Sequence, residues 1–176
     1  MNLLQKLKML LVNGKKRIMT NKFSHLTNQG SAHMVDVSAK EETLRTAKAI
    51  CQVSVSDEVL DLISKDNLPK GDLFSTVRLA GIMASKKVAE LIPLCHPIAI
   101  DGIEVDVAVT NNLIEITSEV RINDRTGVEM EALTAVSIAG LTVIDMVKSV
   151  DPSSHIVEVK VLEKNGGKNG HWINPK

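Results

Sequence analysis

The clearest pattern in the sequence is an alternation of apolar and polar residues between positions 103 and 122. Val and Ile occupy nearly every second position of 103–109 and of 114–122, with mostly charged or hydroxyl residues between them. This period of two predicts two antiparallel strands with one face in water, and Thr110-Asn-Asn112 predicts the turn between them. Shorter runs predict two further strands, Ala47 to Val55 and Ile156 to Leu162.

Helical periodicity occupies three other segments. Ser56 is predicted to cap a short helix in which Val59, Leu60 and Ile63 share a face. A longer helix is predicted from Leu73 to Pro93, because its apolar residues recur every three or four positions. A third helix of about 20 residues is predicted after Gly127. Its apolar face is predicted to consist of Met130, Leu133, Ser137, Leu141 and Ile144.

The predicted order is strand, two helices, two strands, helix, strand. This order is compatible with a ferredoxin-like α+β sandwich, in which helices pack on one face of an antiparallel sheet. We therefore predict that residues 23–176 form a single domain. Because the chain has only two Phe, one Trp and no Tyr, the core must be filled by Val, Ile, Leu and Ala.

The formal net charge of zero is the sum of two unlike parts. Residues 1–22 contain six Lys and Arg and no acid, so the remaining residues carry 15 basic against 21 acidic side chains. A domain with this acidic balance and so few aromatic rings is a poor candidate for binding nucleic acid. We predict no nucleic-acid partner.

Residues 1–22 are predicted to be a disordered basic extension, or to include an upstream start with the natural one at Met19. The alternative is a basic amphipathic helix that touches a membrane surface or a partner. The most apolar run of the chain, Ala132 to Ile144, has 13 residues and is too short to span a bilayer. Two cysteines, Cys51 and Cys95, cannot form a disulfide framework. We expect a soluble, cytoplasmic protein with no membrane partner.

Two segments favour the binding of an anion. The tail Lys164-Asn-Gly-Gly-Lys168-Asn-Gly170 follows a predicted strand, and its glycines would let backbone N–H groups converge on a phosphate. Its alternative is a solvated chain end. Lys70-Gly71-Asp72 stands at the beginning of the long helix, where unpaired N–H groups attract anions. The simpler interpretation there is that Asp72 caps the helix and Lys70 is solvated.

Leu94-Cys95-His96-Pro97 places a cysteine and a histidine between two prolines, which fix the backbone on either side. A Cys-His metal pair would need a second pair of ligands nearby to form a structural zinc site, and the sequence has none. His96 can instead donate to a phosphate or a carbonyl, or serve only the loop's structure.

The last predicted helix carries acids at both ends. Asp145 and Lys148 lie one turn apart and could perform acid/base chemistry, although many such pairs are ordinary salt bridges. Glu129 and Glu131 lie near its start, and Glu131 is roughly 21 Å from Asp145 along the helix axis. If both acids serve one small substrate, they come from two subunits. We therefore predict a site at a subunit interface.

Six segments form a specific combination: His33-Met-Val-Asp36, Lys70-Gly-Asp72, Ala80-Gly-Ile82, Leu91-Ile-Pro-Leu-Cys-His-Pro97, Thr126-Gly-Val-Glu-Met-Glu-Ala-Leu-Thr134 and Lys164-x-Gly-Gly-Lys-x-Gly170. Together they resemble the cyclic pyranopterin monophosphate synthase family of molybdenum-cofactor biosynthesis, over residues 24–170. The resemblance implies a ferredoxin-like subunit assembled as a hexamer, a trimer of dimers, with active sites between subunits. It also implies a lyase reaction, in which 3′,8-cyclo-7,8-dihydroguanosine 5′-triphosphate rearranges to cyclic pyranopterin monophosphate and pyrophosphate is released.

Residue roles follow from the resemblance in the same way. Asp145, Lys148 and Lys70 are expected to be catalytic. The residues expected to contact the substrate are Leu94, Cys95, His96, Met130, Glu131, Glu129, Lys164 and Lys168. No resident cofactor is required, although Mg²⁺ could arrive with the triphosphate.

Two segments depart from the family pattern. Gly170-His171-Trp172 stands where members often have Gly-Asp-Phe, and Asp124-Arg125 where they often have Gly-Lys. Two rival functions are a non-enzymatic module that binds a nucleotide or phosphate metabolite and regulates a partner, and a purely structural oligomer. Neither rival requires Asp145 beside Lys148, and release of pyrophosphate separates both from the enzyme.

Overall fold

The computed structural model describes residues 26, 29–168 and 170–175. The chain divides into two compact units, residues 1–35 and residues 36–176. In the first unit, Leu26 and Ala32 form an isolated antiparallel bridge. The predicted basic extension, residues 1–22, lies outside the described residues. The sheet and all the helices that the described residues form belong to the second unit.

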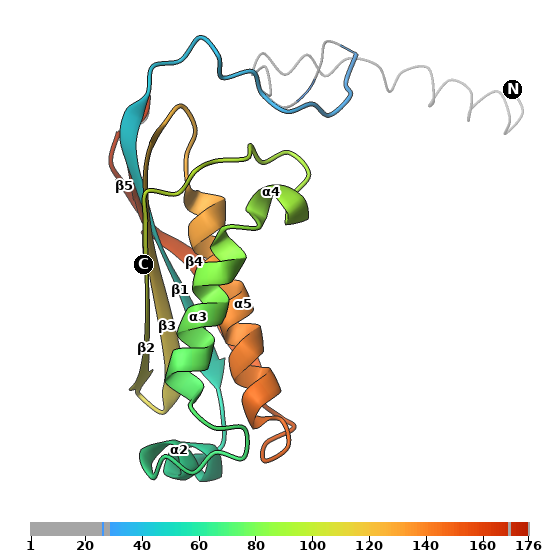
Figure 1. Ribbon diagram of the computed structural model, residues 1–176, viewed down its shortest axis with the longest axis vertical. Coiled ribbons are helices and arrows are strands. Elements are labelled where there is room, and N and C mark those ends of the chain that lie inside the picture. Colours follow the sequence, from blue (N-terminus) through green and yellow to red (C-terminus); the bar gives the residue numbers. More distant parts are fainter. Residues whose placement is uncertain (1–25, 27–28, 169, 176) are drawn as a thin grey trace, which may run out of the picture. The chain divides into compact units, whose positions relative to one another are not determined.

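The sheet has five antiparallel strands in the order β2-β3-β1-β4-β5 (Figure 1). The strands are β1 (Thr43–Ser54), β2 (Gly102–Thr110), β3 (Leu113–Asp124), β4 (His155–Asn165) and β5 (Trp172–Ile173). The four longer strands follow the ferredoxin-like order, and the predicted α+β class is therefore confirmed. The short strand β5 was not predicted, because the tail that contains it carries no alternating pattern.

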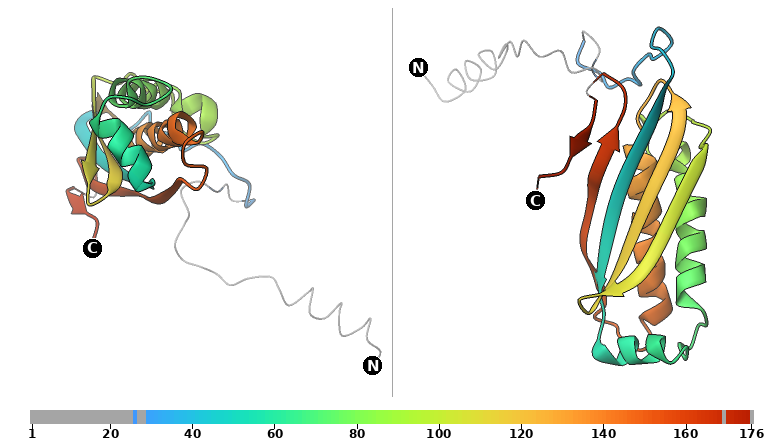
Figure 2. Two further views of the ribbon diagram at one scale, coloured as in Figure 1. Left: turned by 90° about the horizontal axis from the view of Figure 1, so that it is seen from below. Right: turned by 90° about the vertical axis from the view of Figure 1, so that its left-hand side faces the viewer.

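The described helices of the second unit are α2 (Asp57–Ser64), α3 (Leu73–Ser85), α4 (Val88–Leu91) and α5 (Glu129–Val147). Helix α2 lies across one end of the sheet, and the other three lie on one side of it (Figure 1). Helices α3 and α5 run side by side across one face, and none of the described helices lies on the opposite face of the sheet (Figure 2). Ser56 caps α2 as predicted, since its side chain accepts a hydrogen bond from the Val59 N–H.

The predicted hairpin is the most regular part of the sheet. Asn111 and Asn112 have φ angles of 53° and 60°, which identify the two-residue turn that matches the twist of a hairpin. Every even-numbered residue of β3 from Ile114 to Ile122 is buried against the helices. On the wet face, Arg121 pairs with Glu104 across the two strands at 2.9 Å. The prediction of two antiparallel strands with one wet face is confirmed, and Thr110, which was expected in the turn, ends β2 and pairs with Leu113.

The predicted helix from Leu73 to Pro93 is wrong, because the structure divides it into α3 and α4. The Ser85 hydroxyl donates to the Ile82 carbonyl at 2.9 Å, and Lys87 N–H donates to the Ala84 carbonyl at 2.9 Å. These bonds reach back three residues and end the α-helical ladder of α3. Ile92 is extended, as a residue before proline prefers to be, and it ends α4 before Pro93.

The predicted apolar face of α5 is also wrong. Leu141 is 54% exposed, and Met130, Leu133, Ser137 and Ile144 are only half-buried. The fully buried face is made mainly of smaller residues, among them Ala132, Ala135, Val136, Ala139, Gly140 and Val143. Helix α5 is apolar around most of its circumference, so periodicity alone could not identify the buried side. The side with the small residues is the buried one, because small side chains let the helix axis approach the sheet.

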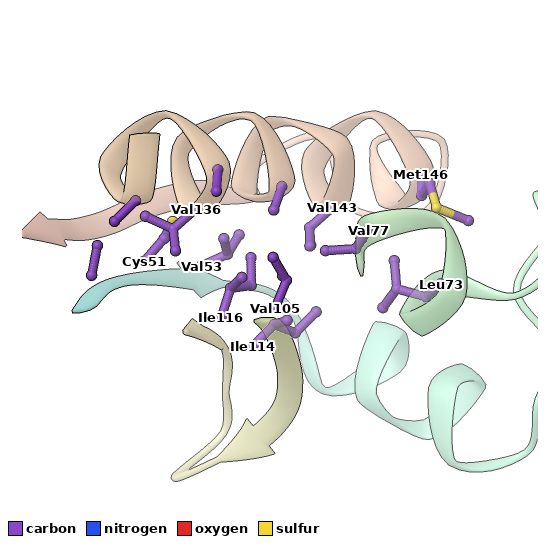
Figure 3. Packing of buried hydrophobic residues seen from close by; sticks show 14 of the residues in the cluster. Cys51, Val53, Leu73, Val77, Val105, Ile114, Ile116, Val136, Val143 and Met146 are labelled. Atoms are coloured by element: carbon purple, nitrogen blue, oxygen red, sulfur yellow. The ribbon is translucent and has the colours of Figure 1, made fainter. Parts of the chain in front are cut away.

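Helix α5 approaches the sheet closely at Gly140. A Cβ atom on Gly140 would lie 2.6 Å from the Cys51 Sγ of β1 and 3.3 Å from the Ile156 Cδ1 of β4. Figure 3 shows Cys51 beneath Val136, and Val77 of α3 beside Val143. The buried hydrophobic residues are all aliphatic or sulfur-containing, which confirms the predicted composition of the core.

Helix α5 is also the one helix among the described residues that is long and apolar enough to cross a membrane, at 19 residues. It extends beyond the apolar run of the sequence analysis at both ends and so includes Glu129, Glu131 and Asp145. Half of its apolar window is buried inside the unit. Packing between the sheet and α3 therefore accounts for its apolar composition.

Substitution of Gly140 by Ala should destabilise the fold, because the new methyl group overlaps Cys51 Sγ. We expect a loss of about 1–3 kcal/mol in the free energy of unfolding, measured by urea titration. Gly102→Ala is the control, since its Cβ would meet only the Arg121 side chain at 3.5 Å. Adding Cys51→Ala to Gly140→Ala should restore part of the lost stability. An unchanged midpoint for Gly140→Ala would contradict the close packing of α5 on β1.

Candidate active site

The carboxy-terminal end of α5 gathers three side chains, Lys70, Asp145 and Lys148, which we call the carboxy-terminal cluster. The Lys70 Nζ donates to Asp145 Oδ2 at 2.8 Å and to the Asp145 main-chain oxygen at 2.7 Å. The Lys148 Nζ lies 2.7 Å from Asp145 Oδ1. The structure thus brings together residues that are 75 positions apart in the chain.

Local structure explains why Lys70 reaches this cluster. Asp72 caps α3 by accepting a hydrogen bond from the Ser75 N–H at 3.0 Å, and Gly71 turns the chain with a φ of 86°. The capping role that the sequence suggested for Asp72 is therefore confirmed. The suggestion that Lys70 is merely solvated is wrong, because its ammonium group makes two hydrogen bonds to Asp145.

Two lysines around one carboxylate set the charge of this cluster. Hydrogen bonds from Lys148, and then from Lys70, lower the pKa of Asp145 to about 2. Asp145 is consequently ionised throughout the neutral range and is a poor proton acceptor there. Its carboxylate instead holds two ammonium groups close together, and the lysines are left as the groups that can act on a ligand.

A second group of side chains surrounds the beginning of α5. We call Cys95, Glu129, Glu131 and Lys164 the amino-terminal cluster. The Lys164 Nζ lies 2.9 Å from Glu129 Oε1, which joins β4 to the first turn of α5. Glu131 is only 3% exposed, and this burial, together with the nearby charge of Glu129, raises its pKa to about 7. A carboxyl group with this pKa can both donate and accept a proton near neutral pH.

The Cys-His loop lies beside this amino-terminal cluster. Leu94, Cys95 and His96 are half-buried, as is Met130 on the first turn of α5. Burial, and then the charge of Glu131, raises the pKa of the Cys95 thiol. Cys95 is thus a neutral thiol near Glu131, which does not suit it for the role of a thiolate ligand or nucleophile.

A cavity of about 280 Å³ opens next to Glu129 and Lys164. Four basic side chains line it, and Glu129 is its one acid. Its full lining is Lys40, Arg45, Thr46, Gly127, Val128, Glu129, Lys164, Asn165, Gly166 and Lys168. The predicted tail lysines therefore do face a cationic cavity, and the size of the cavity suits a small anionic ligand.

Lys40 and Arg45 are the basic residues that the sequence analysis missed. Arg45 has the same parity along β1 as the buried residues Ala47, Ala49 and Cys51, so it belongs to the helix-facing side of the strand. The Arg45 Nε donates to the Asp124 main-chain oxygen at 2.9 Å, which fixes the guanidinium group at the cavity. The sequence could have indicated this position of Arg45, because it precedes Ala47, Ala49 and Cys51 at the same two-residue spacing. The predicted strand began two residues after it.

Two glycines of the tail, Gly166 and Gly167, have a structural role at the beginning of β1. Gly166 and Gly167 have φ angles of 95° and 71°, so both adopt the conformation that favours glycine. A side chain on Gly166 would collide with the Leu44 main-chain oxygen, and one on Gly167 would collide with the Arg45 guanidinium group. These glycines make room for the beginning of β1, and the basic residues of the cavity contribute its positive charge.

The two clusters lie at opposite ends of α5, a helix roughly 28 Å long (Figure 1). Lys70 and Lys148 are at one end, and Lys164 and Lys168 are at the other. These four lysines therefore do not converge within one chain. Among the described residues, no three His, Cys, Asp or Glu side chains are grouped closely enough to hold a metal ion.

Comparison with known proteins identifies close relatives. The sequence profile of the MoaC family matches residues 34–167. The cyclic pyranopterin monophosphate synthase of Streptomyces coelicolor is 51% identical over 152 residues, 86% of this chain and 89% of the relative. The cyclic pyranopterin monophosphate synthase 2 of Mycobacterium tuberculosis is 50% identical over 164 residues, 93% of this chain and 98% of the relative. The synthase of Novosphingobium aromaticivorans is 48% identical over 152 residues, 86% and 97% of the two chains.

The raised pKa of Glu131 should make stability depend on pH. In the unfolded chain this carboxyl has the ordinary glutamate pKa of 4.5, whereas the folded chain retains the proton until about pH 7. The folded state therefore binds more protons between these two values, and stability falls as the pH rises through that window. Glu131→Gln removes this dependence. From pH 4.5 to pH 7.5, we expect the free energy of unfolding of Glu131→Gln, relative to that of wild type, to rise by about 2–3 kcal/mol.

Urea unfolding at several pH values measures this difference. Glu58→Gln changes an exposed acid in the first turn of α2 and is the control for the removal of a surface carboxylate. Parallel stability curves for wild type and Glu131→Gln would show that Glu131 does not titrate in this window.

Proposed function

The chain belongs to the MoaC family, and we propose that it converts 3′,8-cyclo-7,8-dihydroguanosine 5′-triphosphate to cyclic pyranopterin monophosphate, with release of pyrophosphate. It is an enzyme of molybdenum-cofactor biosynthesis, and its reaction is that of a phosphorus–oxygen lyase. The observation that carries this assignment, beyond the relatives, is the carboxy-terminal cluster. Lys70, Asp145 and Lys148 come from two motifs far apart in sequence and meet in hydrogen-bonding contact.

The basic cavity supplies the electrostatic part of the reaction. A triphosphate brings several negative charges, and the pyrophosphate that leaves keeps most of them. Lysine and arginine side chains that are already in place stabilise such charge as it develops, without rearrangement at the moment of reaction. Lys164 and Lys168 are the predicted phosphate ligands, and Lys40 and Arg45 add two further cations to the same cavity. His96 is proposed as a further phosphate ligand. It follows Cys95 in the loop beside the amino-terminal cluster.

The carboxy-terminal cluster supplies the proton transfers. The purine-derived ring must be opened and rebuilt, and each step moves protons on nitrogen or oxygen. The Lys70 ammonium group is held at two points by Asp145, which suits a fixed clamp on the substrate. Lys148 is held at one point, to Asp145 Oδ1, and keeps more donors for the substrate. We assign proton transfer to Lys148, and the positioning of both lysines to Asp145.

Glu131 is proposed to join the chemistry from the amino-terminal cluster. Its pKa of about 7 lets it exchange a proton with the heterocycle at neutral pH. Leu94, Cys95, His96 and Met130 surround it as substrate contacts. Any Mg²⁺ that takes part is proposed to arrive with the triphosphate, since oxygen atoms of phosphate are ligands that this ion prefers.

A complete site is proposed to require two subunits. Within one chain the two clusters are separated by the length of α5. A single small substrate can therefore contact both kinds of cluster only where the carboxy-terminal cluster of one subunit lies next to the amino-terminal cluster of another. Exposed apolar side chains on the outer faces of α3 and α5 support such assembly, with Leu79 59% exposed and Met83 60% exposed. We propose a hexamer, a trimer of dimers, with the active sites between subunits.

The compartment proposed for the reaction is the cytoplasm. Both cysteines, Cys51 and Cys95, are free in the structure. Burial raises the pKa of Cys51 to about 11, so this thiol is unreactive. Free thiols of this kind are typical of proteins from a reducing compartment.

Purified protein given the cyclic dihydroguanosine triphosphate should release pyrophosphate, measured by a coupled phosphate assay. Lys148→Ala should lower kcat by about 100-fold or more, because it removes the proton-transfer group. Asp145→Asn should also lose turnover while it retains substrate binding. Lys87→Ala is the control, since Lys87 pairs with Glu90 at the same helical spacing outside both clusters. Normal turnover by Lys148→Ala would overturn its assigned role.

Mixing two inactive variants should restore activity if the site lies between subunits. Lys148→Ala and Lys164→Ala damage opposite ends of α5, so a mixed dimer contains one intact site. Random mixing of subunits should therefore recover about a quarter of wild-type activity. Lys148→Ala mixed with Asp145→Asn is the control, and it should stay inactive because both changes affect the same end. A mixture of opposite ends that also stays inactive would contradict the shared site.

A further inference from the structure

The last described strand, β5, pairs directly with Lys164, one of the lysines that line the basic cavity. Strand β5 pairs antiparallel with the end of β4, with Trp172 opposite Lys164 and Ile173 opposite Glu163. The Asn174 N–H donates to the Leu162 main-chain oxygen at 2.8 Å, and the Asn174 Nδ2 donates to the Val161 oxygen at 2.7 Å. Directly opposed residues of an antiparallel pair place their side chains on the same face of the sheet.

Trp172 therefore meets Lys164 side by side. The Lys164 Nζ lies over the indole ring, 5.9 Å from its centroid, within the range of a cation–π interaction. The same ammonium group lies 2.9 Å from Glu129 Oε1. A lysine side chain is long and flexible and loses much entropy when it is fixed. Here two contacts from two different elements, α5 and β5, restrict where its charge can be.

A second side-chain contact joins the beginning of β5 to β4. The His171 Nε2 lies 2.7 Å from Glu163 Oε1, one position before Trp172 and one before Lys164. His171 and Trp172 also form one of the two places at which the sequence departs from the common family pattern, the other being Asp124-Arg125. A second cavity of about 450 Å³ is lined by Glu129, Val161, Lys164, His171 and Trp172. The Lys164–Glu129 pair lines this cavity and the basic cavity alike.

We propose that Trp172 is a positioning residue for the phosphate site, whose indole face holds the Lys164 ammonium group toward Glu129 in the wall of the basic cavity. Trp172 acts through Lys164 and does not itself line the basic cavity. Fixing this charge before the ligand arrives removes an ordering cost that binding would otherwise meet. The inference rests on the proposed function, in which Lys164 binds the phosphate groups.

The test measures the binding of inorganic tripolyphosphate to the full chain by calorimetry. Trp172→Leu keeps an apolar side chain for the strand but removes the aromatic face, and we expect its Kd to rise about 2- to 5-fold. Trp172→Phe retains an aromatic face and should recover part of that loss. Ile173→Ala, on the same strand, is the matched control and should leave the Kd unchanged. Thermal unfolding of each variant reports the stability of the fold separately.

A double-mutant cycle distinguishes action through Lys164 from a general effect. In a Lys164→Ala background, Trp172→Leu should cause no further loss of tripolyphosphate affinity. The proposal is overturned if the loss persists undiminished in that background, if Ile173→Ala causes the same loss, or if wild type binds no tripolyphosphate. Because Trp172 is the only tryptophan and the chain has no tyrosine, its fluorescence should also change on binding, and Lys164→Ala should abolish that change.

This readout is independent of turnover. Wild-type protein that binds tripolyphosphate with the expected cycle but releases no pyrophosphate from the cyclic substrate would contradict the proposed function and leave the role of Trp172 standing. Pyrophosphate release by wild type, with no coupling between Trp172 and Lys164 in the double-mutant cycle, would support the proposed function and contradict the role of Trp172. In turnover, Trp172→Leu should lower kcat/KM by about the factor by which it weakens tripolyphosphate binding.

Discussion

The close contact between Gly140 of α5 and Cys51 of β1 sets the geometry of the whole second unit. Because Gly140 has no side chain, the helix can lie so close to β1 that a Cβ atom there would be only 2.6 Å from the Cys51 sulfur. At that distance a core of Val, Ile, Ala and Leu is thick enough to fill the layer, and no aromatic residue is needed. The position of α5 in turn fixes every side chain at its two ends, because a helix holds its residues at constant spacing and rotation.

Each end of α5 uses a different physical device. At the carboxy-terminal end, two ammonium groups share one carboxylate that stays ionised, so charge is held in place by pairing. At the amino-terminal end, burial of Glu131 weakens its acidity, and the basic side chains around the cavity remain available to a ligand. In the proposed reaction, the first arrangement would hold the proton carriers and the second would bind the anion. On this proposal, an acidic domain accommodates a triphosphate because some of its basic side chains gather at two small places.

Much of the fold was predictable from local pattern, and the exceptions have identifiable causes. Ile114 to Ile122 alternate so strictly that the strand and its buried face both follow from the sequence. Leu141 and its neighbours were assigned to the core because α5 is apolar on nearly all sides, and only the contact at Gly140 selects the buried face. In the candidate site, the pairing of Asp145 with Lys148 follows from helical spacing. The arrival of Lys70, and the place of Arg45 at the cavity, depend on tertiary contacts that no local pattern contains.

Helix α5 also constrains how this chain can change in length. One residue inserted between Glu131 and Asp145 would turn the two ends by about 100° relative to each other and move them apart by about 1.5 Å. Asp145 would then lose Lys70, which comes from a loop that does not move with the helix. A residue added at the Asn111–Asn112 turn would alter only the tip of a hairpin. The central helix is therefore the segment whose length is fixed, whereas the hairpin tip is free to lengthen.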